Sequence, residues 1–213
     1  MPKKYLDVSK WQGNIDWNAV KASGKVDGVM IRALGSKGSK PYVDPTFEAN
    51  YAGATAAGLP VGVYYYSTAT TKAQADAELA MLRKALAGKV LGLPVAVDIE
   101  DVHLTGLDKQ DLTALTAYAL GVIQSWGVYA MLYTYLSFAA SRLYMGGAAL
   151  KPYDVWLAAY RKDKPATAYP YGIWQYTDKG SVPGVSTGVD LSLAYKDYAG
   201  IIRRKGLDRL REG

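Results

Sequence analysis

The chain of 213 residues contains no cysteine and only one histidine, His103. The absence of cysteine excludes disulfides, thiolate metal sites and a cysteine nucleophile. A histidine-based zinc site or a Ser-His-Asp hydrolase would have to be built around His103, which we expect in a solvated polar loop. Glycine-rich nucleotide-binding loops are also missing. We therefore predict an activity that needs no metal and no cofactor.

Long apolar segments are absent as well. No run of about 18 apolar residues occurs, so the sequence predicts no insertion into a membrane. The first residues include Lys3 and Lys4, but no apolar region follows them, which argues against a secretion signal. We expect a protein that is made in the cytoplasm without a signal peptide.

The composition is that of a globular protein, with 50% apolar and 21% charged residues. Its aromatic residues are 18 Tyr, 5 Trp and only 2 Phe. Because Tyr and Trp combine an aromatic face with a polar group, this bias suits contact with sugars. The net charge of +6 suits a polyanionic partner, which could be nucleic acid, anionic lipid or a cell wall that carries phosphate polymers. The alternative is a basic surface without a partner.

The stretch over residues 93–101 (LPVAVDIED) organises the chain. Apolar side chains alternate with small and then acidic ones, which is the period of a β-strand. Asp98 and Glu100 therefore project from one face, and their repulsion raises at least one pKa. A carboxylic acid beside an ionised carboxylate is what glycoside hydrolysis requires. Alternatively, the two residues begin a solvated loop.

Strand and helix patterns alternate through the first two thirds of the chain, and three strand-like segments with short connections follow. The expected strands cover 5–9, 28–34, 60–67, 93–101, 128–134, 154–160, 171–176 and 188–191. This order predicts an α/β fold, an irregular TIM-like barrel of eight strands and about five helices whose last three strands are helix-poor. Residues 35–43 are predicted as a loop, and Asp44-Pro45 as a helix start.

The active site of a parallel barrel lies where the C-terminal ends of its strands meet. Six polar residues fall at or near such ends, namely Asp7, Tyr64, Asp98, Glu100, Tyr133 and Asp190. Arg32 places a charge inside an apolar run and needs a partner if it is buried. Trp11 and Trp174 are interpreted as barrel packing, while Trp156 and Tyr133 are predicted to contact glycan.

Several motifs in this order resemble glycoside hydrolase family 25, the lysozymes of bacteria, phages and some fungi. The motifs are 7–13 (DVSKWQG), 62–64 (GVY), 98–100 (DIE), 173–176 (IWQY) and 189–191 (VDL). The resemblance implies an irregular barrel that cleaves the β-1,4 bond between N-acetylmuramic acid and N-acetylglucosamine. It assigns residues 1–195 to the catalytic barrel. Residues 196–213 are interpreted as a basic terminal helix or as a stub of a linker to a cell-wall-binding domain.

The resemblance also implies roles for individual residues. Glu100 matches the general acid, and Asp98 its carboxylate partner, expected to stay ionised and to stabilise the sugar cation or orient the 2-acetamido group. Asp7 matches a further acid of the catalytic group. Tyr65 stands where many members have His, which predicts a change of packing. The residues predicted to bind substrate are Asp190, Tyr64, Tyr133, Trp156, Arg32 and Gln175, the last of which has the alternative of satisfying a backbone group.

The partner implied by this resemblance is bacterial peptidoglycan, and the positive charge adds anionic wall polymers as a further expected partner. No nucleic acid partner is predicted, and a monomer is expected. A basic lysozyme without a secretion signal suggests a phage or prophage endolysin that reaches the wall after release. Two alternatives stay open: a catalytically silent glycan-binding barrel and a chitinase-like glycosidase.

Overall fold

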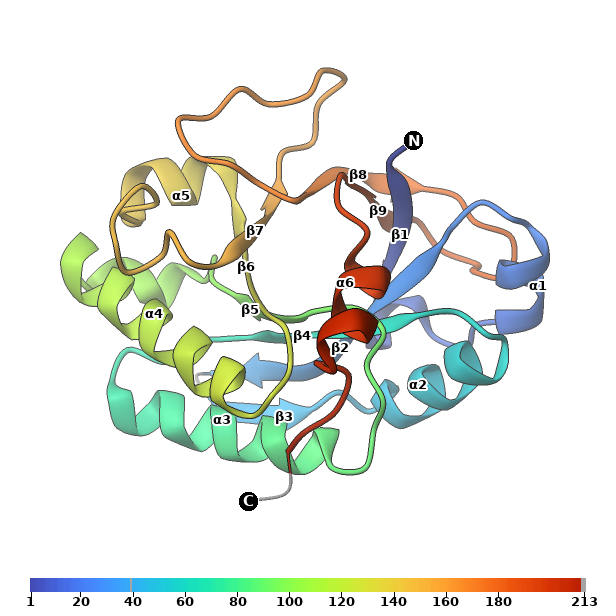
Figure 1. Ribbon diagram of the computed structural model, residues 1–213, viewed down its shortest axis with the longest axis horizontal. Coiled ribbons are helices and arrows are strands. Elements are labelled where there is room, and N and C mark those ends of the chain that lie inside the picture. The colour runs from blue at the N-terminus through green and yellow to red at the C-terminus, as the bar shows by residue number, and fades with distance from the viewer. Residues whose placement is uncertain (39, 212–213) are drawn as a thin grey trace.

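Eight strands close into a barrel in the computed structural model, which describes residues 1–38 and 40–211 (Figure 1). Around the barrel the order is β1-β9-β8-β7-β6-β5-β4-β2, and β2 pairs with β1 to close it. The strands are β1 (Lys3–Val8), β2 (Gly28–Lys37), β4 (Val61–Tyr66), β5 (Val95–Asp98), β6 (Ala130–Tyr135), β7 (Asp154–Ala158), β8 (Ile173–Gly180) and β9 (Val189–Ala194). The predicted irregular α/β barrel is confirmed.

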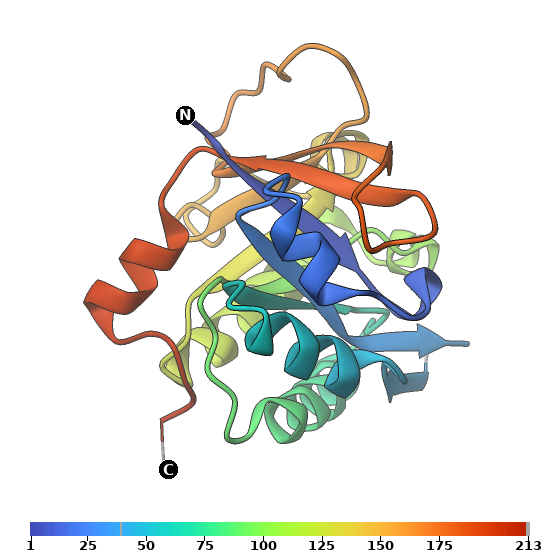
Figure 2. The same ribbon diagram turned by 90° about the vertical axis from the view of Figure 1, so that its right-hand side faces the viewer.

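Six α-helices accompany the strands, one more than the approximate number expected. They are α1 (Trp17–Ala22), α2 (Phe47–Ala56), α3 (Lys72–Leu86), α4 (Lys109–Ser125), α5 (Leu136–Arg142) and α6 (Tyr198–Lys205). In Figures 1 and 2, α2, α3 and α4 cover the outside of the barrel, and no α-helix separates β7, β8 and β9. No helix in the described part of the chain is both long and apolar enough to cross a membrane.

The direction of β9 differs from the expected all-parallel barrel. β9 runs antiparallel to both β1 and β8, and its register places Asp190 opposite Asp7. The connection from β8 to β9 is too short for a crossover helix, so the chain reverses direction instead. Asp190 therefore lies at the start of its strand, yet at the same barrel end as the C-terminus of β1.

Alternation along each strand divides the apolar residues into two clusters. On β5, Val95 and Val97 pack outward beneath the helices, whereas Ala96 belongs to the cluster that fills the barrel. Asp98 follows Ala96 on the inner face, as the period of two requires. The inner face thus changes from small to acidic toward the C-terminal end of the strand.

The segment predicted as a loop over 35–43 forms a β-hairpin instead. β2 continues to Lys37 and pairs with the added strand β3 (Lys40–Val43), with Gly35 opposite Tyr42. The following helix, α2, begins at Phe47 rather than at Asp44-Pro45. The carboxylate of Asp44 instead accepts hydrogen bonds from Lys10 and Arg32, which belong to distant segments.

The C-terminal segment packs on the barrel. After α6, the Leu91 amide donates to the Asp208 carbonyl at 2.6 Å, and the Arg211 amide donates to the Trp126 carbonyl at 2.8 Å. Tyr198 of α6 is buried. The expected helix is therefore confined to 198–205, and an extended segment follows it to Arg211; the last two residues of the predicted linker stub lie outside the described residues.

Candidate active site

A cavity of about 440 Å³ opens at the C-terminal ends of the parallel strands. It brings together residues from seven of the eight barrel strands. The predicted site residues that line it are Asp7, Arg32, Tyr64, Asp98, Glu100, Tyr133, Trp156 and Asp190. An α/β barrel with an acidic and aromatic cavity at this end has the architecture of a glycoside hydrolase.

Asp98 and Glu100 each present a buried oxygen that has no hydrogen-bond partner among the described residues. Asp98 ends β5 and is 4% exposed, and Glu100 follows two residues later. The unpartnered atoms are Oδ1 of Asp98 and Oε2 of Glu100. Because buried polar atoms are nearly always hydrogen-bonded, these two unpaired carboxylate oxygens distinguish Asp98 and Glu100 from supporting polar residues, and both residues line the cavity.

Burial raises the pKa of Glu100 to about 7, with further increases from the charges of Asp190 and Asp101. A substantial fraction of Glu100 is therefore protonated at neutral pH. Burial also raises the pKa of Asp98 well above its usual value, and the charges of Glu100 and Asp7 add to this shift. The free protein thus favours protonation of Asp98, which differs from the expectation of an ionised Asp98.

Asp7 and Asp190 complete an acidic cluster. Burial and the charge of Asp190 raise the pKa of Asp7, while burial and then Asp178 raise the pKa of Asp190 to about 6. Carboxyl groups this close cannot all ionise, so the cluster shares protons. This arrangement keeps a proton available beside the cavity.

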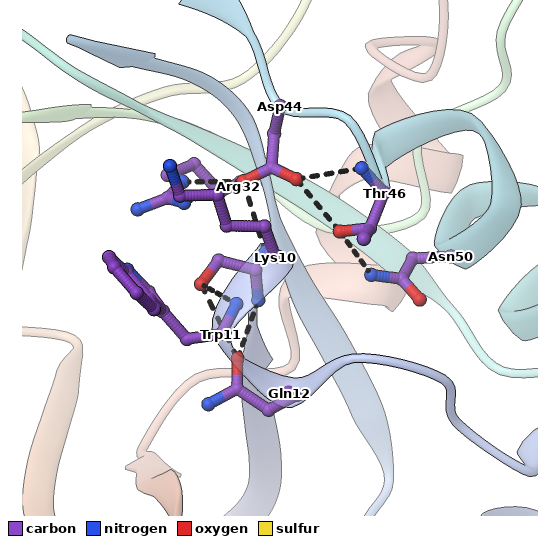
Figure 3. A network of polar contacts seen from close by, with 8 residues as sticks. Lys10, Trp11, Gln12, Arg32, Asp44, Thr46 and Asn50 are labelled. Atoms are coloured by element: carbon purple, nitrogen blue, oxygen red, sulfur yellow. Dashed lines mark hydrogen bonds and ion pairs between the residues drawn. The ribbon is translucent and has the colours of Figure 1, made fainter. Parts of the chain in front are cut away.

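Arg32 supplies positive charge to this cluster and is itself fixed by Asp44. The guanidinium contacts Asp44 Oδ2 through both Nε and Nη2 at 2.7 Å (Figure 3). The positive charge of Arg32 opposes the rise in the pKa of both Asp7 and Asp98. The charge of Arg32 within an apolar strand was the sequence signal that a partner existed, but it did not identify Asp44.

Asp44 also holds two backbone segments. It accepts hydrogen bonds from the Thr46 amide at 2.9 Å and hydroxyl at 2.7 Å, and from the Lys10 amide at 3.1 Å (Figure 3). Lys10 begins the 3₁₀ turn Lys10–Gln12, whose residues line the cavity. The buried carboxylate of Asp44 therefore connects the turn Lys10–Gln12, the side chain of Arg32 and Thr46, the residue before α2.

Gln175 does not line the cavity, which differs from its predicted role in binding substrate. Its side chain is fully buried and donates from Nε2 to Asp7 Oδ2 at 2.8 Å. Its Oε1 accepts from the hydroxyls of Tyr133 at 3.0 Å and Tyr160 at 3.1 Å. Gln175 therefore positions Asp7 and two tyrosines from behind the cavity wall.

The aromatic residues divide into buried wall and exposed rim. Trp156 is 1% exposed and meets the ring of Tyr133 edge-on at 4.7 Å. Trp11, predicted to pack in the barrel, is instead 70% exposed and lines the cavity. Its turn is capped by Ser9 and Gln12, which fixes the backbone while the indole projects outward. Trp11 is therefore available to a ligand.

Tyr64 and Tyr65 separate as alternation on a strand requires. Tyr64 lines the cavity, while Tyr65 packs with the outer apolar cluster. The expectation that Tyr65 changes packing rather than chemistry agrees with this placement. Among lining residues that received no role from the sequence are Tyr42, Tyr66 and Tyr135. In the sequence, the high number of tyrosines was the one indication that such residues would line a site.

Replacement of Asp44 by asparagine should destabilise the fold by about 2–3 kcal/mol, because several buried donors would face an amide and lose a charged acceptor. Urea denaturation measures this free energy of unfolding. Asp27→Asn is the matched control, since Asp27 pairs with Lys3 on the surface and should change stability by less than about 1 kcal/mol. Equal effects of the two substitutions would contradict the role assigned to Asp44.

Comparisons with known proteins agree on one family. The profile of glycosyl hydrolases family 25 matches residues 6–185. The autolytic lysozyme of Clostridium acetobutylicum is 33% identical over 188 residues, which cover 88% of this chain and 54% of that protein. This chain therefore spans about half the length of that relative. The chain belongs to glycosyl hydrolases family 25.

Solved structures agree with this assignment. The catalytic domain of endolysin ply40, from bacteriophage P40 of Listeria monocytogenes, has a TM-score of 0.75 at 26% identity, covering 97% of this chain and 98% of that one. The modular autolysin LytC of Streptococcus pneumoniae, solved with a synthetic peptidoglycan ligand, has a TM-score of 0.78 at 25% identity, covering 91% and 46% respectively.

Proposed function

We propose that this protein is a lysozyme that cleaves the β-1,4 bond between N-acetylmuramic acid and N-acetylglucosamine in bacterial peptidoglycan. The observation that carries the proposal is the pair Asp98 and Glu100, each with a buried and unpartnered oxygen at the cavity of a family 25 barrel. The raised pKa of Glu100 suits a proton donor. The solved neighbour that holds a peptidoglycan ligand supports the choice of substrate.

In the proposed mechanism Glu100 protonates the glycosidic oxygen as the bond to the anomeric carbon breaks. Positive charge then develops on the sugar, and Asp98 stabilises it directly or orients the 2-acetamido group that attacks the anomeric carbon. A water then attacks the anomeric carbon, and its proton returns to Glu100 as the product forms. In the free protein the raised pKa favours protonated Asp98. The mechanism therefore requires Asp98 to lose its proton as the cationic sugar forms, because that positive charge favours the ionised carboxylate. Asp7, held by Gln175, and Asp190 tune this proton balance.

We further propose that the chain acts as an endolysin, in which case the cell wall is its place of action. The similarity to a phage endolysin domain over nearly all of this chain supports this assignment. The basic charge of the protein suits an anionic wall.

Digestion of purified peptidoglycan tests the activity. Borohydride reduction of the products followed by mass spectrometry should show reduced N-acetylmuramic acid at the new chain ends. Reduced N-acetylglucosamine would instead indicate a different glycosidic specificity. Binding to peptidoglycan without any new reducing ends would identify a silent binding barrel and contradict the proposal.

The rate of hydrolysis should fall as the pH rises through about 7, because the protonated form of Glu100 is lost above its pKa. Asp101→Asn removes one negative charge that raises this pKa. The basic limb of the profile of kcat/KM against pH should therefore move to lower pH in this variant. A basic limb that does not move, or that moves to higher pH, would contradict the assignment of this limb to Glu100.

A further inference from the structure

A groove of about 740 Å³ lies on the barrel away from the catalytic cavity. It is formed by the end of α3, the turn that follows it and the end of the described chain. The end of α3 and its turn precede β5, and the Arg211 amide donates to the carbonyl of Trp126 shortly before β6. The groove therefore lies at the N-terminal ends of these strands, whereas the catalytic cavity lies at the C-terminal ends. The lining residues differ completely from those of the active site.

The groove is strongly basic. The five charged residues that line it are all positive, namely Arg83, Lys84, Lys89, Arg209 and Arg211. Two of them have carboxylate partners outside the lining: Lys89 contacts Glu48 at 2.9 Å and Arg209 contacts Asp208 at 3.3 Å. Arg83 and Lys84 are exposed and form no ion pair with any described residue. Among the described residues, no carboxylate therefore pairs with Arg83 or Lys84 in this groove.

The other lining residues indicate which anion fits. Ala80, Ala87, Val90 and Leu210 are small or aliphatic, and no aromatic side chain of the described residues lines the groove. Proteins that bind single-stranded nucleic acid without sequence preference stack the bases on aromatic side chains, and this groove lacks such a surface. Arginine side chains bind phosphate groups through paired N–H donors. The chemistry therefore favours a phosphate polymer without bases.

We propose that this groove binds the phosphodiester backbone of an anionic cell-wall polymer. The choice of a wall polymer rests on the proposed function, which places the protein at the bacterial wall. Binding here would hold the barrel by the end opposite to the catalytic cavity, so that the cavity stays open to glycan. The groove would raise the local concentration of the enzyme without contacting the bond that is cleaved.

Binding of poly(glycerol phosphate), measured by calorimetry at several salt concentrations, tests the groove. The double variant Arg83→Gln/Lys84→Gln should bind more weakly and lower the slope of log affinity against log salt by about 1.4, roughly 0.7 for each lost phosphate contact. Lys25→Gln/Lys162→Gln is the control, because it removes the same charge outside the groove. It should keep the wild-type slope, and thermal melts should show that both variants are folded.

Two results would overturn the proposal. One is an equal loss of binding in the groove variant and in the control, which would indicate attraction by net charge alone. The other is tighter binding of single-stranded DNA with the same number of phosphates, which would assign the groove to nucleic acid. The probe contains no glycosidic bond, so this outcome is independent of whether the protein hydrolyses peptidoglycan. On peptidoglycan freed of anionic polymer, the groove variant should cleave at the wild-type rate.

Discussion

Glu100→Gln should lower kcat on purified peptidoglycan by about 10²–10⁴-fold, the usual contribution of a positioned proton donor. Glutamine has nearly the same shape as glutamate but carries no acidic proton. Release of new reducing ends over time measures the rate. The position of Glu100 at the cavity and its raised pKa are the structural reasons to expect so large an effect.

Glu48→Gln provides the matched control for this substitution. Glu48 is exposed on α2, outside the cavity, and its ion pair with Lys89 lies on the surface. This variant should keep the wild-type rate on peptidoglycan freed of anionic polymer. Full activity of Glu100→Gln would contradict the proposed mechanism, because no other described residue combines a position at the cavity with a pKa of about 7.

Asp98→Asn should lower kcat by about 10²–10³-fold, the usual loss when a group that stabilises transition-state charge is removed. The same substitution should stabilise the fold at alkaline pH. Burial raises the pKa of Asp98 above its unfolded value, so its ionisation in the native state costs stability as the pH rises. Thermal melts at pH 4 and pH 8 should show a gain in the variant that grows with pH.

Asp154→Asn is expected to change stability in the opposite direction. The hydrogen bonds and charge of Lys196, with Tyr129 and Tyr198, lower the pKa of Asp154, so its ionised form stabilises the fold above the unfolded pKa. The variant should therefore melt lower than the wild type at pH 8. A loss of stability in Asp98→Asn that is as large as that of Asp154→Asn would contradict the view that Asp98 is a costly buried acid.

These two predictions illustrate a common division between activity and stability. An acid cluster with unpartnered oxygens is unfavourable for the fold, but its residues line the cavity where substrate can bind. In contrast, Asp44 is buried with its oxygens engaged by Arg32, Thr46 and Lys10. The structure thus distinguishes a reactive carboxylate from a supporting one, although the residue type is the same.

Local sequence patterns were sufficient to predict the strand that ends in Asp98. The alternation over 93–100 fixed which side chains face inward, because successive side chains on a strand point to opposite faces. The start of α3 also depends on a local contact, because the side chain of Thr71 accepts a hydrogen bond from the Gln74 amide. The helix–strand order likewise predicted the barrel, and with it the end at which acidic residues would meet.

The roles of Gln175, Asp44 and Trp11 were not contained in any local pattern. Gln175 bonds to Asp7 across 168 residues of chain, and Asp44 is joined to Arg32 and to the Lys10 turn from separate segments. Whether Trp11 packs or projects depends on how its capped turn sits against the barrel.

By itself, the sequence determined the strand faces, the main helices and the acids that would gather at one end of a barrel. Only the tertiary structure decided the direction of β9, the proton sharing among the four acids and the placement of the basic groove. The physical reason is that periodicity acts between neighbours in the chain, whereas burial and charge act between neighbours in space.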